Sequence, residues 1–139
     1  MFFPGRGTLD APVPSCVFTD PELARVGMSV EQAEAAHGTD TDVWQLDLTR
    51  NDRARAEART QGSVVVITAK GRVVGAHLLA PVAGEMVHEL SSAIQRELRL
   101  DELAESLHAY PTYSGAIGQV ATEAAFEKAQ RLRWLMKRR

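Results

Sequence analysis

The most apolar part of the chain consists of two β-branched runs separated by a short turn. The runs are Val64-Val65-Val66-Ile67 and Val73-Val74-Gly75-Ala76-His77-Leu78-Leu79, with Lys70-Gly71 between them. Apolar runs on either side of a glycine-containing break predict a β-hairpin. Their continuous apolar character indicates strands that are covered on both faces. Pro81 ends the second strand, because proline has no amide hydrogen for the ladder.

Three further segments are predicted to be extended: Val13–Thr19, Ala24–Met28 and Thr41–Thr49. In the last one, apolar and polar positions partly alternate, which is typical of a half-buried strand. Between the first two, Asp20-Pro21-Glu22 predicts a turn that opens with helical geometry. Asp20 would be its cap and Pro21 its first helical position.

Two helices have clear signals in the sequence. Ser29-Val30-Glu31-Gln32 fits a capping box, which predicts a helix over Val30–Ala36, and Gly38 supplies the left-handed residue that ends it. The strongest helical period covers Glu85–Leu98. Its apolar positions recur at spacings of three and four, namely Met86, Val87, Leu90, Ala93, Ile94 and Leu98.

The rest of the second half is also helical in character. A short helix is predicted over Asp101–Leu107 and a long alanine-rich helix over Ala116–Met136, with an irregular segment around Pro111 between them. Asn51–Arg59 is highly charged and has no apolar stripe, so we expect an exposed turn or short helix there. Strands thus come first and helices cluster at the end, which predicts an α+β fold with a mostly antiparallel sheet flanked by helices.

Length and composition restrict the functional class. The 139 residues favour one domain, and the net charge of -2 with a pI near 6.1 argues against a polyanion-binding chain. The single cysteine, Cys16, permits no internal disulfide. No apolar run approaches the ~20 residues of a membrane helix, and the first residues lack the pattern of a signal peptide, so we expect a cytoplasmic protein with neither membrane nor nucleic-acid partners.

The candidate chemistry of the isolated residues is weak. His77 lies in an apolar strand, where a hydrogen-bonded core histidine is expected, and His88 lies on a helix face exposed to solvent. The alternative is a self-sufficient small α+β enzyme or metal-binding protein that uses His77, His88 and His108. Cys16 is expected to be a small apolar residue rather than an activated nucleophile.

The charged and aromatic segments near the C-terminus leave further alternatives. The six basic residues of Lys128–Arg139 are expected to form a helix end in solvent that complements the helix dipole, and nucleic-acid binding is the alternative. His108-Ala109-Tyr110-Pro111-Thr112-Tyr113-Ser114 is an aromatic, proline-bent connection between helices. Such a loop either presents side chains to a partner or simply joins two helices.

Several segments together resemble one protein family. The chain is similar to the C-terminal dimerisation domain of the FAD-dependent pyridine nucleotide–disulfide oxidoreductases, over roughly Pro14 to Ala125. Each segment is weakly specific alone, but their order and spacing agree. The segments are Val17-Phe18-Thr19-Asp20-Pro21-Glu22-Leu23-Ala24-Arg25-Val26-Gly27, Asn51-Asp52-Arg53-Ala54, Val74-Gly75-Ala76-His77, Gly84-Glu85-Met86-Val87-His88-Glu89, Leu103-Ala104-Glu105 and the loop His108–Ser114.

The resemblance implies a homodimer in which a loop of one subunit reaches the flavin and redox thiols of the other. It implies that residues 1–13 are a linker leaving an FAD domain and that residues 14–139 form the dimerisation domain. The chain itself would hold no cofactor and would be inactive alone, whereas the full-length oxidoreductase would use FAD and NAD(P)H in upstream domains. The expected interface residues are Met86, Leu90, Ile94, His108, Tyr110, Pro111 and Tyr113.

The chain departs from the family at its reactive loop. In the family, a histidine directly before the proline acts as acid–base catalyst, and a glutamate shortly after the proline orients it. Here Tyr110 precedes Pro111, and Gly115 stands at the glutamate position. The resemblance therefore places Tyr110 at the catalytic position and, with Pro111, near the partner's flavin. A tyrosine here is more similar to the mercuric reductase branch.

Overall fold

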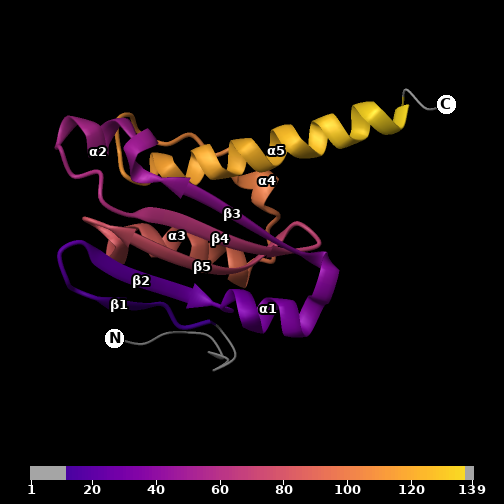
Figure 1. Cartoon of the computed structure of the whole chain (residues 1–139), viewed down its shortest axis with the longest axis horizontal. Helices are drawn as coiled ribbons and strands as arrows, with labels where there is room; N and C mark the ends of the chain where they lie inside the picture. Colours follow the sequence, from indigo (N-terminus) through magenta and orange to yellow (C-terminus); the bar gives the residue numbers. More distant parts are fainter. Residues whose placement is uncertain (1–11, 137–139) are drawn as a thin grey trace, which may run out of the picture.

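The computed structural model describes residues 12–136, so the first eleven residues of the predicted linker lie outside the described part. One antiparallel sheet of five strands forms the centre of the molecule, in the order β1-β2-β5-β4-β3 (Figure 1). All of its neighbouring pairs are antiparallel. The strands are β1 (Ser15–Val17), β2 (Glu22–Gly27), β3 (Thr41–Asp47), β4 (Ser63–Ala69) and β5 (Arg72–Ala80).

The helices flank this sheet, so the predicted α+β class is confirmed. Helix α3 packs against β5 and β2, whereas α5 packs against β3 and β4. Figure 1 shows the C-terminal part of α5 extending beyond the end of the sheet. The helices are α1 (Val30–His37), α2 (Asp52–Ala56), α3 (Ala83–Gln95), α4 (Leu100–Leu103) and α5 (Gly115–Met136), with short 3-10 turns η1 (Gly38–Asp40) and η2 (Leu48–Arg50).

The predicted hairpin is the centre of the sheet. Strands β4 and β5 pair with one register shift between Ile67 and Thr68, and both turn residues, Lys70 and Gly71, have positive φ values of 51° and 80°. Positive φ at both central residues gives the twist that a two-residue hairpin needs. β5 ends at Ala80, directly before Pro81, as the missing amide hydrogen predicts.

The capping box of α1 is also confirmed. The Gln32 amide donates to the Ser29 hydroxyl over 3.2 Å, and the Ser29 amide donates to the Gln32 side chain over 2.9 Å. Gly38 follows the helix with a φ of 56°. These reciprocal bonds satisfy two amide groups that would otherwise have no partner at the start of the helix.

Two local predictions are wrong. The helical turn predicted at Asp20-Pro21-Glu22 is absent from the described chain, because Glu22 already begins β2 and pairs with Ala80 of β5. Cross-strand pairing here outweighs a local capping signal. The helix predicted over Asp101–Leu107 is shorter: α4 ends at Leu103.

The main hydrophobic core lies between the sheet and helices α3 and α5. Met86 and Leu90 of α3 are 1% and 0% exposed and belong to this core, and Ile94 is partly buried against it. The apolar stripe that suggested an interface therefore packs inside the chain. Burial of each such large side chain contributes about 1.5–3 kcal/mol.

The other face of the sheet is covered at one end only. Helix α1 packs against β3 and β4 there. Leu23 and Leu79 are cross-strand neighbours, and they are 49% and 37% exposed. Side chains alternate between the two faces along a strand. Leu23 and Leu79 therefore lie on the face of the sheet that points away from the core residues Ala24 and Leu78.

The close approach of β5 to the start of α1 gives a stability prediction. A Cβ at Gly75 would lie 2.0 Å from the Met28 carbonyl oxygen, whereas a Cβ at Gly115 would meet nothing closer than 3.8 Å. We expect Gly75→Ala to lower the free energy of unfolding by about 2 kcal/mol or more. Gly115→Ala, at the start of α5, is the matched control and should be neutral or slightly stabilising. Equal urea midpoints for the two variants would contradict this packing.

Candidate functional site

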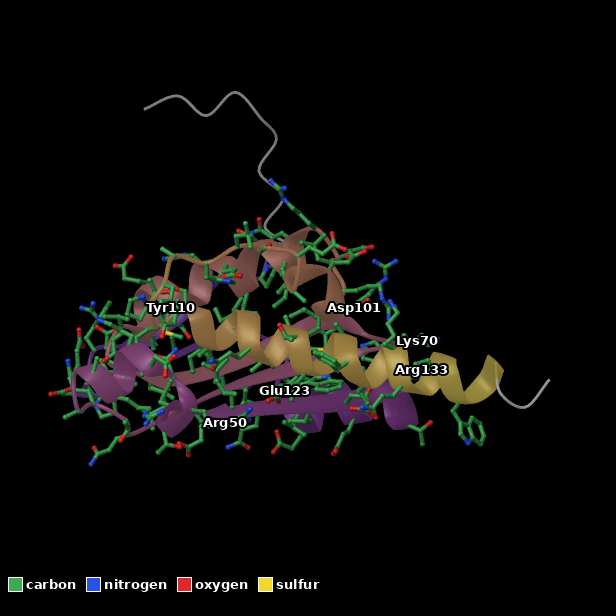
Figure 2. All side chains as sticks on the ribbon, turned by 90° about the horizontal axis from the view of Figure 1, so that it is seen from above. Arg50, Lys70, Asp101, Tyr110, Glu123 and Arg133 are labelled. Atoms are coloured by element: carbon green, nitrogen blue, oxygen red, sulfur yellow. The ribbon has the colours of Figure 1, made fainter. Side chains whose placement is uncertain are left out.

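The site is built on the loop that joins α4 to α5. Tyr110 stands at the outer end of this loop and is 81% exposed, and the neighbouring Pro111 is also exposed. The peptide bond between them is cis. Figure 2 shows Tyr110 beside the N-terminal end of α5, whereas Lys70 and Asp101 lie farther along that helix. The loop therefore presents an aromatic ring outward.

A buried asparagine fastens the loop to α2. Asn51 is 2% exposed. Its side-chain oxygen accepts the amide of Ala54 over 3.0 Å, which caps α2. Its side-chain nitrogen donates to the carbonyl of Thr112 over 3.0 Å. The segment predicted to be only an exposed turn or short helix is thus anchored by a buried polar side chain.

The next residue of α2 holds the tyrosine ring. The Tyr110 hydroxyl donates to the Asp52 carboxylate over 2.8 Å. This hydrogen bond, and then the negative charge of Asp52, raise the pKa of Tyr110 above its ordinary value. Tyr110 therefore stays protonated near neutral pH, and its hydroxyl is a donor rather than a base.

Tyr113 has a different place from the exposed interface position predicted for it. Its residue is only 7% exposed and belongs to the core, although its hydroxyl donates to Glu57 over 2.8 Å. Burial, and then the hydrogen bond to Glu57, raise the pKa of Tyr113. The same hydrogen bond lowers the pKa of Glu57. Tyr113 thus anchors the loop from within.

His108 fastens the beginning of the loop to α3. Its Nε2 lies 3.0 and 3.1 Å from the two carboxylate oxygens of Glu89. The other side of the ring packs against α5, where a Cβ at Gly118 would lie 2.8 Å from Nδ1. Gly118 therefore leaves the space that the imidazole occupies. His108 is placed to position the loop through its contact with Glu89.

A cavity of about 450 Å³ opens between this loop, α2 and α5. It carries charges of both signs, and one pair, Arg50 and Glu123, forms an ion pair of 2.5 Å across it. Its lining includes Arg50, Asp52, Arg53, Tyr110, Thr112 and Gln119. A polar hollow beside an exposed aromatic ring is suited to contact with another protein surface.

The other candidate residues do not gather around this loop. His88 is exposed, as expected, whereas His77 is half-buried and its side chain makes no hydrogen bond within the described part of the chain. The hydrogen-bonded core histidine predicted at position 77 is therefore wrong. No group of three histidine, cysteine or acidic side chains suited to a metal occurs in residues 12–136.

The structure also bears on two further expectations, the reactivity of the Cys16 thiol and the presence of a membrane-spanning helix. Cys16 packs partly buried against the core, and burial and then the charge of Glu22 raise the pKa of its thiol. It therefore lacks the lowered pKa of an activated nucleophile.

Among the helices described, none combines the length and apolar character that crossing a membrane requires.

The described residues do not fit a flavin or a nicotinamide dinucleotide on their own. Such cofactors are held by parallel strands joined through a glycine-rich turn and a helix. The pairs in this sheet are all antiparallel, and Gly71 before β5 and Gly75 within it serve turn geometry and packing.

The two tyrosines give a prediction for this site. Both phenols donate to carboxylates, so we expect both to titrate above the ordinary value of about 10, as measured by ultraviolet absorbance. Asp52→Asn should return Tyr110 toward its ordinary pKa and leave Tyr113 displaced. Glu57→Gln is the matched control and should affect Tyr113 instead. Unchanged titration in Asp52→Asn would contradict the Tyr110–Asp52 contact.

Comparisons with known proteins agree with this geometry. Residues 13–121 match the family model "Pyridine nucleotide-disulphide oxidoreductase, dimerisation domain". The chain is 39% identical over 119 residues to dihydrolipoyl dehydrogenase, mitochondrial, of Bos taurus, and the match covers 84% of this chain and 23% of that protein. The human enzyme matches to the same extent.

Solved structures give the same result. LpdA from Mycobacterium tuberculosis matches with a TM-score of 0.72 and 32% identity, over 81% of this chain and 25% of that one. The HOCl-induced flavoprotein disulfide reductase RclA from Escherichia coli matches with a TM-score of 0.77 and 29% identity, over 86% and 28%. The chain thus spans about a quarter of the length of these relatives. It belongs to the dimerisation-domain family of the pyridine nucleotide–disulphide oxidoreductases.

Proposed function

We propose that the chain pairs with a second copy and presents the Tyr110 loop to the flavin and redox-thiol site of the partner subunit. The observation that carries this proposal is an 81%-exposed tyrosine on a loop whose neighbours are tied to the body. Asn51 and His108 supply those ties through Thr112 and Glu89. An exposed aromatic side chain on a preorganised loop is a common anchor in protein interfaces.

The interface is proposed to lie on the exposed part of the loop side. The core buries the side chains of Met86, Leu90 and Tyr113. The exposed members of the predicted interface are therefore Tyr110 and Pro111. Gln119 and Thr122 on the neighbouring exposed face of α5 would extend it. Obligate dimers bury more than ~2,000 Å², so the contact would continue beyond this loop.

The role proposed for Tyr110 differs from that of a family histidine. A phenol that donates to Asp52 cannot accept a proton near neutral pH, so it cannot act as the base. Tyr110 would instead shield the partner's flavin or hydrogen-bond its thiol. The histidine–glutamate pair that the family has around this proline is missing, since Tyr110 and Gly115 occupy its two positions.

The parent protein is proposed to be an FAD-dependent NAD(P)H oxidoreductase, with residues 14–139 as its dimerisation domain and residues 1–13 as the linker from the FAD domain. The isolated chain would then be inactive. Tyr110 favours a mercuric-reductase-like branch, whereas the relatives named above are dihydrolipoyl dehydrogenases and flavoprotein disulfide reductases. A cytoplasmic location remains the prediction from the sequence, although the matched dihydrolipoyl dehydrogenases are mitochondrial.

Analytical ultracentrifugation of the chain tests the proposed pairing. We expect a species of twice 15.2 kDa at concentrations on the order of 100 µM, well above the dissociation constant of a stable dimer. Tyr110→Lys should shift this equilibrium toward monomer, because its ammonium group can still bond Asp52 but places a charge in the interface. Val43→Lys is the control, since Val43 is 47% exposed on the opposite face of the sheet. Monomer alone at these concentrations would contradict the proposal.

A further inference from the structure

A second cavity lies at the other end of the packed part of α5. It has a volume of about 380 Å³ and opens between β3, the β4–β5 turn, α4 and α5. Figure 2 shows Lys70 and Asp101, two of its lining residues, well separated along α5 from Tyr110. No residue of the Tyr110 loop is among the residues that line this cavity.

One wall of this cavity lies beyond the family match. That match ends at residue 121, whereas Ala124, Glu127 and Lys128 of α5 line the cavity. Lys128 forms an ion pair with Asp101 of α4, and Arg99 contacts the same carboxylate over 3.0 Å. These contacts hold the extended part of α5 against α4. The cavity is thus built partly by a segment outside the matched family domain.

The lining charges are largely paired, but one carboxylate is left over. The lining contains four acidic and three basic side chains. Lys70 lies 3.5 Å from Asp40, and Asp101 is bonded by Arg99 and Lys128 as described above. Among the side chains that the structure places, none forms a hydrogen bond or ion pair with the Asp42 carboxylate. The Asp42 carboxylate is therefore available to a ligand in the cavity.

An aromatic ring lies beside this carboxylate. Trp44 follows Asp42 by two positions on β3, so both side chains lie on the same face of the sheet. The Trp44 indole nitrogen donates to the Thr68 hydroxyl over 3.2 Å, which fixes the ring. Trp44 is half-buried and lines the cavity with Thr68. An indole face attracts a cation through its ring electrons, and the neighbouring Asp42 carboxylate would supply the counter-charge.

We propose that this cavity binds a small organic cation of the alkylammonium class, with Trp44 as its aromatic wall and Asp42 as its counter-charge. The volume falls within the range of small-molecule sites. The three basic side chains of the lining already contact carboxylates: Lys70 contacts Asp40, and Arg99 and Lys128 share Asp101. The site is separate from the proposed dimer contact, so either proposal can fail without the other.

Choline and its neutral tert-butyl isostere are the probes that test this site on the whole chain. Binding is followed through the indole N–H resonance of Trp44 in NMR spectra, which Trp134→Phe distinguishes from that of Trp134. We expect choline to shift the resonance saturably, with a dissociation constant on the order of 1 mM. The isostere should bind at least about fivefold more weakly, since it has the same shape without the charge. Equal shifts from both probes, or no shift from choline, would overturn the proposal.

Two matched variants locate the counter-charge. Asp42→Asn removes the unpaired carboxylate and should weaken choline binding about tenfold, because a direct charge partner is lost. Glu34→Gln removes an exposed carboxylate that does not line the cavity and should leave the affinity unchanged. Thermal unfolding of both variants checks that they are folded. Wild-type affinity in Asp42→Asn would sink the assignment, as would an equal loss in both variants.

Discussion

The arrangement of the loop side depends on the two hydrogen bonds of one buried amide. Asn51 caps α2 with its oxygen and holds Thr112 with its nitrogen, so it joins segments that lie 61 residues apart. A buried amide that lost either partner would pay a desolvation cost of about 1–3 kcal/mol. Both contacts therefore persist together. They place Asp52 where its carboxylate accepts a hydrogen bond from the Tyr110 hydroxyl. This hydrogen bond fixes the direction of the exposed ring.

Local patterns in the sequence predicted the elements well where the period was strong. The β4–β5 hairpin, α3 and α5 follow from apolar runs, helical spacing and turn residues, and the capping box located α1. The pattern could not say what an apolar stripe packs against. Met86 and Leu90 lie on the stripe of α3 as predicted, but they cover the chain's own sheet. Periodicity reports burial, whereas the partner surface depends on the tertiary arrangement.

The candidate site was predictable in part. The exposed Tyr110 and Pro111 follow from a proline-bent aromatic loop, and Asn before Asp-Arg-Ala carries an N-cap signal that could have predicted the buried Asn51. The pairings with Asp52, Glu57 and Glu89 could not be predicted, because the partners are distant in sequence. The role of Gly118 could not be predicted either, because a glycine is needed there only to leave space for the His108 imidazole that packs against it.

Helix α5 takes part in both cavities of the chain. Its first turns support the loop that the family model includes, and its continuation past residue 121 builds the second cavity. Hydrogen–deuterium exchange on Asn51→Ala tests most directly whether one amide organises the loop side. The account predicts faster exchange at both Ala54 and Gly115, since the cap and the turn at Thr112 loosen together. Acceleration at Ala54 alone, with Gly115 unchanged, would contradict it.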